Sequence, residues 1–111
     1  MTLQTLRDIL GEAGIPVAHY KIKLTEYPYI VWRELATSNN HASGNAWREV
    51  ISVSIDHFTK KAFDPSVDKL KLALLRHKIS FTTAVIWYED DELIQTQFTL
   101  SIARKWEVTQ Q

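Results

Sequence analysis

The sequence predicts an α+β fold, with an antiparallel sheet of about four to five strands and two helices packed on one face of it. Two observations predict this class. Leucine-rich stretches with helical spacing occur near the N-terminus and again after residue 64, and the other segments are rich in β-branched and aromatic residues. Polar segments join the expected strands, which favours hairpins and antiparallel pairing. The expected order is α-β-β-β-α-β-β.

The first helix is expected to end near residue 13. Leucines recur at three- and four-residue steps from residue 3 to residue 10, with polar residues on the opposite side. Gly14 can adopt the left-handed conformation that ends a helix, and Pro16 prevents the helix from resuming. A short strand over residues 17–22 is expected to follow.

The next two strands are expected to form a hairpin. Residues 29–35 are rich in aromatic and β-branched side chains that suit a pleated surface. The segment 37–45 has little to bury and many side chains that bond their own backbone, which predicts a long connection. From residue 47 to residue 56, apolar and polar residues alternate, as is typical of a strand with one solvated face.

A second helix is expected to begin after Asp64. An aspartate followed by Pro65 is a typical helix start, because the carboxylate caps the first turn and proline fits the first helical position. Basic residues up to Lys78 suit the negative end of the helix dipole, so the helix is expected to stop there. The last two strands, 81–88 and 93–103, are separated by four acidic residues that predict a tight turn.

Two of the strands are apolar on both sides. In strand 93–103 the apolar and polar residues separate onto two faces, but strands 29–35 and 81–88 carry large apolar side chains on both. Two helices cover only one face of the sheet, so the apolar side chains on the other face predict a contact with another protein. The alternative is that these strands are central and that flanking loops shield them. The predicted subunit-interface residues are Tyr29, Val31, Trp32, Ile86 and Tyr88.

The polar connection is a second candidate for assembly. Long polar loops on a rigid sheet often carry contacts, although many are only flexible connections. The predicted assembly-loop residues are Ser38, Asn39, Asn40, His41 and Asn45.

Length, charge and cysteine content exclude several classes of protein. The 111 residues suit a single α+β domain, 1–111. The 13 basic and 13 acidic residues balance, so the chain lacks the positive field of a nucleic-acid-binding module. With no cysteine it has neither a disulfide nor a thiolate metal site. Neither a signal-peptide pattern nor a run of about 18 apolar residues occurs, so neither export by a signal peptide nor membrane spanning is expected.

No catalytic or metal-binding pattern stands out. The four histidines, His19, His41, His57 and His77, lack the spacing of metal ligands, and His57 and His77 are expected to be solvated or satisfied by a helix dipole. The contiguous carboxylates of 89–92 predict a solvated cluster rather than a calcium loop. Neither a phosphate-binding glycine loop nor a serine nucleophile elbow occurs. We expect no catalytic residue, no cofactor and no metal.

Four short motifs resemble small tail proteins of phages and prophages of Gram-positive bacteria. They are Gly-Ile-Pro-Val-Ala at 14–18, Tyr-Pro-Tyr-Ile-Val-Trp at 27–32, Ser-Asn-Asn at 38–40 and Trp-Tyr-Glu-Asp-Asp-Glu-Leu-Ile-Gln-Thr at 87–96. Over nearly its whole length the chain is similar to the tail-terminator or tail-completion (head-tail joining) proteins of long-tailed phages. Residues 41–44 depart from the loop pattern of that family.

This resemblance implies an α+β subunit that forms rings, commonly hexamers, at the head-proximal end of the tail tube. It implies contacts with copies of itself and with tail-tube and head-connector proteins, in a virion tail assembled in the host cytoplasm. It also implies no catalytic residue. Two alternatives from other classes remain open: a monomeric adaptor or inhibitor that binds one host protein, and a small α+β enzyme.

Overall fold

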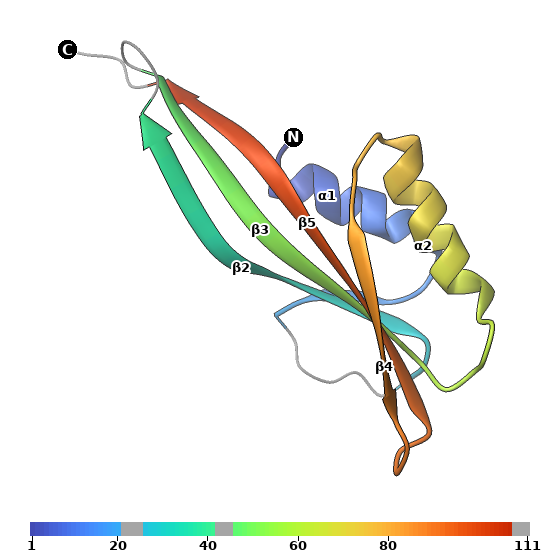
Figure 1. The fold of residues 1–111 in the computed structure, drawn as a ribbon. Coiled ribbons are helices and arrows are strands. Elements are labelled where there is room, and N and C mark those ends of the chain that lie inside the picture. The colour runs from blue at the N-terminus through green and yellow to red at the C-terminus, as the bar shows by residue number, and fades with distance from the viewer. Residues whose placement is uncertain (21–25, 42–45, 108–111) are drawn as a thin grey trace.

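The structure, a computed structural model, describes residues 1–20, 26–41 and 46–107 of the chain. It is an α+β fold with a five-stranded sheet and two helices, as predicted (Figure 1). The elements are α1 (Leu3–Leu10), the 3-10 turn η1 (Gly11–Ala13), β1 (Val17–His19), β2 (Tyr29–His41), β3 (Ala46–Thr59), α2 (Pro65–Arg76), β4 (Thr82–Tyr88) and β5 (Leu93–Glu107).

The sheet is mixed rather than purely antiparallel. Its strand order is β1-β2-β3-β5-β4, and β1 pairs with β2 in parallel, with Val17 opposite Ile30. The prediction failed here because β1 and β2 are not joined by a hairpin. β2 begins at the same end of the sheet as β1, and Ile30 N–H donates to the carbonyl of Pro16 at 2.9 Å.

The β2–β3 hairpin is longer than predicted. Residues 37–41, expected in a connection, continue β2 and pair with β3 as far as His41 opposite Trp47, after a bulge between Glu34 and Ala36. Polar side chains tolerate this because β3 is paired on its other side with β5, which runs to Glu107, so the cross-strand ladder supports the backbone. The three strands extend beyond the helices, in a molecule 56 Å long (Figure 1).

The helix boundaries lie close to the predicted ones: α1 and η1 together end at Ala13, and α2 begins after Asp64 but ends at Arg76, before the expected Lys78. The Thr2 hydroxyl caps α1 by accepting from Thr5 N–H at 3.0 Å, and Gly14 follows η1 in the left-handed region, with φ of 75°. An Asp64 carboxylate oxygen caps α2 by accepting from Ser66 N–H at 2.9 Å. Within the described residues, neither helix is long and apolar enough to cross a membrane.

The core lies between the helices and one face of the sheet. The two helices contribute leucines that are fully buried, and β2, β3 and β5 contribute the apolar residues of the facing side. The principal members are Leu6, Leu10, Leu70 and Leu74 from the helices and Ile30, Trp32, Val53, Ile55, Phe98 and Leu100 from the sheet. The predicted packing of both helices on one face is confirmed.

Candidate functional site

The apolar side chains of β2 are mostly enclosed within the single chain, which corrects a prediction. Tyr29, Val31 and Trp32 are 3%, 8% and 3% exposed. β2 lies between β1 and β3, so neither of its edges is free along these residues. The ring of Tyr29 also packs against that of Phe58, at 5.1 Å between centroids. The alternative of a shielded central strand therefore holds for these three predicted interface residues, whose apolar surfaces are covered within the single chain.

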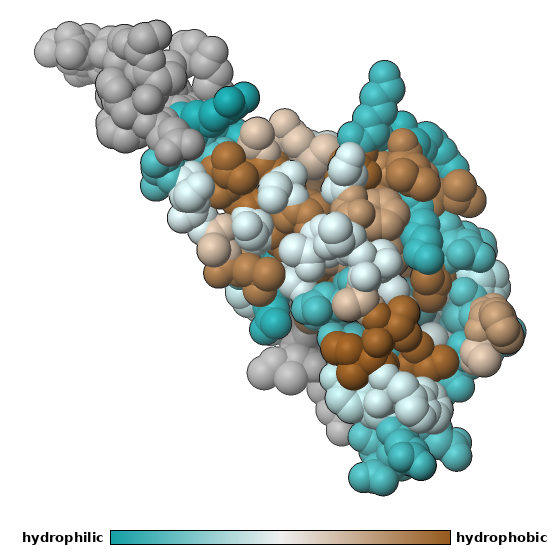
Figure 2. Space-filling model, in the orientation of Figure 1, coloured by the Kyte–Doolittle hydropathy of each residue, from teal (hydrophilic) through white to brown (hydrophobic). Residues whose placement is uncertain are grey.

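Strand β4 is exposed on both faces. It lies at the end of the sheet beside β5, and all seven of its residues are exposed. Val85 and Trp87, 68% and 56% exposed, lie on the helix side of the sheet, whereas Ile86 and Tyr88 lie on the other. We call these four residues the β4 surface. Figure 2 shows a compact apolar patch on the lower part of the molecule, where Figure 1 places β4.

The β4 surface continues towards the start of α2. A cavity of about 500 Å³ lies between the first turn of α2 and strands β4 and β5, and its apolar lining includes Val67, Val85 and Ile94. Phe63, which also lines this cavity, has a left-handed backbone with φ of 57° and is fully exposed. The apolar surface is therefore larger than one strand edge.

A polar network holds Tyr88 on the opposite face of the sheet. The Tyr88 hydroxyl donates to Gln95 Oε1 at 2.5 Å, and Gln95 Nε2 donates to Asp56 Oδ1 at 2.9 Å. Gln95 and Asp56 are 9% and 7% exposed. The sequence pattern placed both on a solvated face and missed this network, because alternation along one strand does not show which polar residues meet across three strands.

His57 is buried rather than solvated, contrary to the prediction. Its Nε2 lies 2.7 Å from Ser66 Oγ, which in turn donates to Asp64 Oδ1 at 2.8 Å. The only proton of the Ser66 hydroxyl is donated to Asp64, so Ser66 Oγ must accept the hydrogen bond from His57 Nε2. His57 Nδ1 has no partner in the described residues. Burial lowers the pKa of His57 below 6.5, although the nearby Asp64 opposes this. This group anchors the N-terminus of α2 to β3.

The carboxylate in this group is stabilised as an anion. Burial raises the pKa of Asp64, but hydrogen bonds from the Thr59 hydroxyl at 2.6 Å and from Ser66 outweigh it, so the net pKa is lowered. A serine whose proton already bonds a cap carboxylate is not an activated nucleophile. The contacts therefore fit a structural role for this triad.

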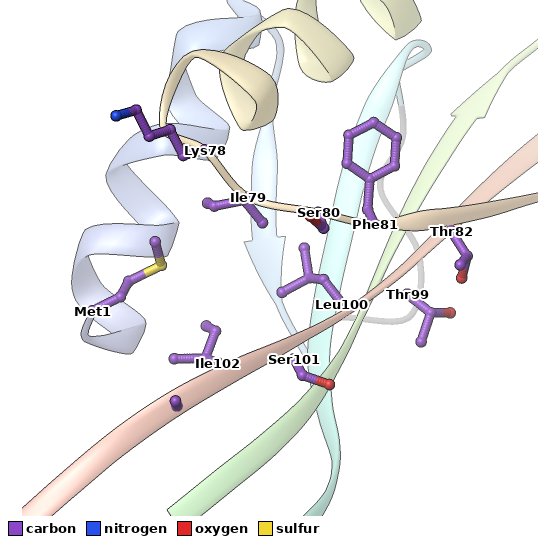
Figure 3. A pocket seen from close by; sticks show the side chains of 11 residues that line it. Met1, Lys78, Ile79, Ser80, Phe81, Thr82, Thr99, Leu100, Ser101 and Ile102 are labelled. Atoms are coloured by element: carbon purple, nitrogen blue, oxygen red, sulfur yellow. The ribbon is translucent and has the colours of Figure 1, made fainter.

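Another cavity, of about 660 Å³, runs along the edge of β5 (Figure 3). β4 begins at Thr82 opposite Thr99, so beyond this pair β4 leaves the edge of β5 uncovered. Hydroxyl groups of Ser80, Thr82, Thr99 and Ser101 and apolar side chains such as Leu100 line the groove. Its lining contains neither a carboxylate nor an imidazole. Within the described ranges, no group of three or more His, Cys, Asp or Glu side chains could hold a metal ion.

A third cavity, of about 410 Å³, lies where α1 begins; we call it the α1 pocket. Its lining residues are Thr2, Leu3, Gln4, Arg7, His19, Trp32 and Arg104. His19 stacks on Trp32 with ring centroids 4.0 Å apart, and its Nε2 lies 2.9 Å from Glu34 Oε1. The α1 pocket therefore gathers basic side chains from three separate elements.

Glu34 stays anionic beside this pocket. Burial raises the pKa of Glu34, but hydrogen bonds from the Tyr20 hydroxyl and from His19 outweigh it and lower the net pKa.

The predicted assembly loop is mostly strand. Ser38 and Asn39 are exposed on β2, Asn40 and His41 complete that strand, and Asn45 lies outside the described residues. The structure does not bring the described ones together with Ile86 and Tyr88, because the last residues of β2 and of β4 lie towards opposite ends of the molecule (Figure 1).

No family model matches the chain, and no curated protein matches its sequence. The assignment of a function therefore depends on the surfaces of the chain itself and on the motifs described above.

Proposed function

We propose that this protein is a structural subunit that assembles head to tail into a ring, commonly a hexamer, which terminates the tail tube of a phage or prophage and joins it to the head. The β4 surface is the observation that carries the proposal. An edge strand with apolar side chains on both faces invites pairing with another chain unless a partner covers it.

The two edges of the sheet differ, as a ring requires. A head-to-tail contact joins two different patches on each subunit, and it closes when the rotation between neighbours divides a full turn. β4 offers seven exposed residues at one edge, whereas β1 offers three residues at the other. The long β2–β3–β5 ribbon could reach a neighbouring ring or the tube, and the resemblance to tail terminators supplies the biological setting.

The first experiment measures mass in solution. Light scattering coupled to size-exclusion chromatography, at micromolar protein, should report a closed oligomer for the natural chain and a monomer for Trp87→Asp. Leu72→Asp is the matched control, because Leu72 on α2 is 57% exposed and Trp87 is 56% exposed. A natural chain that stays monomeric at every salt concentration, or that forms only a stoichiometric complex with one host protein, contradicts the ring.

The second experiment tests the place in the tail. Phage particles that lack this protein should show overlong tubes by negative-stain microscopy, and the natural chain, but not Trp87→Asp, should restore the length. Tails of normal length that remain unattached to heads would instead identify a joining protein.

A further inference from the structure

The α1 pocket has the chemistry of an anion site. Arg7 from α1 and Arg104 from β5 bring guanidinium groups to it, and His19 adds an imidazole. Leu3 and Gln4 also line it, and their backbone N–H groups precede the first bond of the helix, from Leu6 N–H to the Thr2 carbonyl. The start of a helix attracts negative charge, because its first N–H groups and its dipole both point outwards there.

An unpartnered donor belongs to the same pocket. The indole of Trp32 is 3% exposed and lines the α1 pocket, yet its Nε1–H meets no acceptor in the described residues. Buried donors are nearly always paired, so this one points to an acceptor that the single chain does not supply. A carboxylate has the two acceptor oxygens that an arginine and a second donor can share.

The chain also carries a complementary group at its other end. The turn 89–92, which follows β4, holds four exposed carboxylates, and none of them is paired with a cation in the described part of the chain. The turn lies at the bottom of Figure 1 and α1 lies far above it. β4 and β1 are opposite edges of the sheet, so one chain cannot place its turn in its own pocket.

We propose that the acidic turn 89–92 of one copy docks into the α1 pocket of the next copy. This inference rests on the proposed ring and names its polar contact. It makes the contact heterologous, with the β4 edge of one subunit against the β1 edge of its neighbour. Carboxylates of the turn meet Arg7, Arg104 and the first N–H groups of α1, while the adjacent β4 surface is covered by the same neighbour.

Two of the basic side chains of the pocket, Arg7 and His19, have acidic neighbours. Asp8 lies 3.6 Å from Arg7, with both side chains more than 60% exposed, and such exposed pairs contribute little. The Nε2 atom of His19 is hydrogen-bonded to the Glu34 carboxylate. A docked turn that excludes water strengthens the attraction between its carboxylates and Arg7, since charges interact more strongly away from solvent.

Charge reversal tests the contact in both directions. The turn variant, Asp90→Lys with Asp91→Lys, and the pocket variant, Arg7→Glu with Arg104→Glu, should each weaken assembly by about 100-fold in concentration. A chain with all four substitutions should assemble again, because its basic turn then meets an acidic pocket. The matched control, Lys69→Glu with Lys78→Glu on exposed residues elsewhere, should assemble like the natural chain.

The outcomes separate this inference from the proposed function. Light scattering that shows rings for the natural chain and for both reversed variants overturns the docking but leaves the ring. A natural chain that is monomeric overturns both. Recovery in the fourfold variant supports the docking, and failure to recover, with an unfolding midpoint like that of the natural chain, contradicts it.

Two further measurements address an unfolded variant and a different occupant of the pocket. If Arg104→Glu unfolds the chain, Arg7→Glu alone carries the comparison, because its side chain is 62% exposed. Titration of inorganic phosphate into the monomeric turn variant identifies a different occupant. Saturable heat at micromolar phosphate, together with intact rings in the pocket variant, would assign the pocket to a free anion and overturn the docking of the turn.

Discussion

Strands β2 and β4 carry similar side chains and have opposite surroundings. Both place aromatic and β-branched residues on alternate sides of the sheet, yet Tyr29, Val31 and Trp32 on β2 are at most 8% exposed, whereas Val85 and Trp87 on β4 are more than half exposed. Leu35, at the bulge of β2, is the exception, at 49% exposed.

The difference comes from the position of each strand in the sheet. β2 has β1 and β3 as neighbours, and Trp32 packs in the core under the helices. On the other face, the ring of Tyr29 packs against the rings of Tyr27 and Phe58. β4 has only β5 beside it and lies at the edge. The same pattern of residues therefore stabilises the fold in one place and leaves an exposed apolar edge, of the kind that pairs with another chain, in the other.

The largest expected effect is the loss of a β2 side chain from the core. Trp32→Ala should destabilise the subunit by about 3–5 kcal/mol, because removal of a large buried side chain loses its contacts and leaves a cavity. Urea unfolding in the monomeric Trp87→Asp background measures this without a contribution from assembly. A loss below about 1 kcal/mol would contradict the enclosure of β2.

The next effect concerns the polar network behind β4. Asp56→Ala should cost about 1–3 kcal/mol, because Gln95, which is 9% exposed, loses the acceptor of its Nε2 group. Gln97→Ala is the comparison, since Gln97 is only half-buried and donates to Ser54 at 3.1 Å. The free energy of unfolding of both variants is measured by urea unfolding. Equal losses would show that burial of the Asp56–Gln95 hydrogen bond adds nothing to its contribution to stability.

A smaller effect is the pH dependence that His57 imposes beside β2. Burial lowers the pKa of His57 in the folded state below 6.5, so the unfolded chain takes up the proton first as pH falls. Stability is therefore full above about pH 6.5 and declines as pH falls from there towards the folded pKa of His57. Thermal unfolding between pH 8 and pH 5 should show this decline.

His57→Gln should remove that decline, while His77→Gln on the exposed end of α2 should leave it in place. The lowered pKa values of Asp64 and Glu34 act in the same direction but in a lower range, below about pH 4, where those carboxylates take up protons in the unfolded chain. A decline that persists in His57→Gln above pH 5 would contradict the assignment to His57.

The smallest effect on stability is expected at β4 itself. Trp87→Ala should change the free energy of unfolding of the monomer by no more than about 0.5 kcal/mol, since the side chain is 56% exposed. The same substitution should weaken assembly, which light scattering detects. A large loss of stability with assembly unchanged would reverse the contrast between the two strands.

Much of the fold follows from local chemistry in the sequence. Helical leucine spacing, the caps at Thr2 and Asp64, the left-handed Gly14 and the tight acidic turn are properties of neighbouring residues, and the structure has each of them. The separation of apolar and polar residues onto the two faces of β5 is equally local, because side chains alternate along any strand.

Other features came only with the tertiary structure. The parallel pairing of β1, the continuation of β2 through residues 37–41 and the burial of His57 all depend on partners distant in the chain. The basic residues of the α1 pocket come from α1, β1 and β5, so the sequence offers no spacing by which to find them.

The sequence alone determined the order of the helices and strands and which sides of them are apolar, because periodicity and capping act over a few residues. Only the tertiary structure decided which two-sided strand lies inside the sheet and which lies at its edge. The physical reason is that a side chain's exposure depends on the order of strands across the sheet, and long-range pairing sets that order.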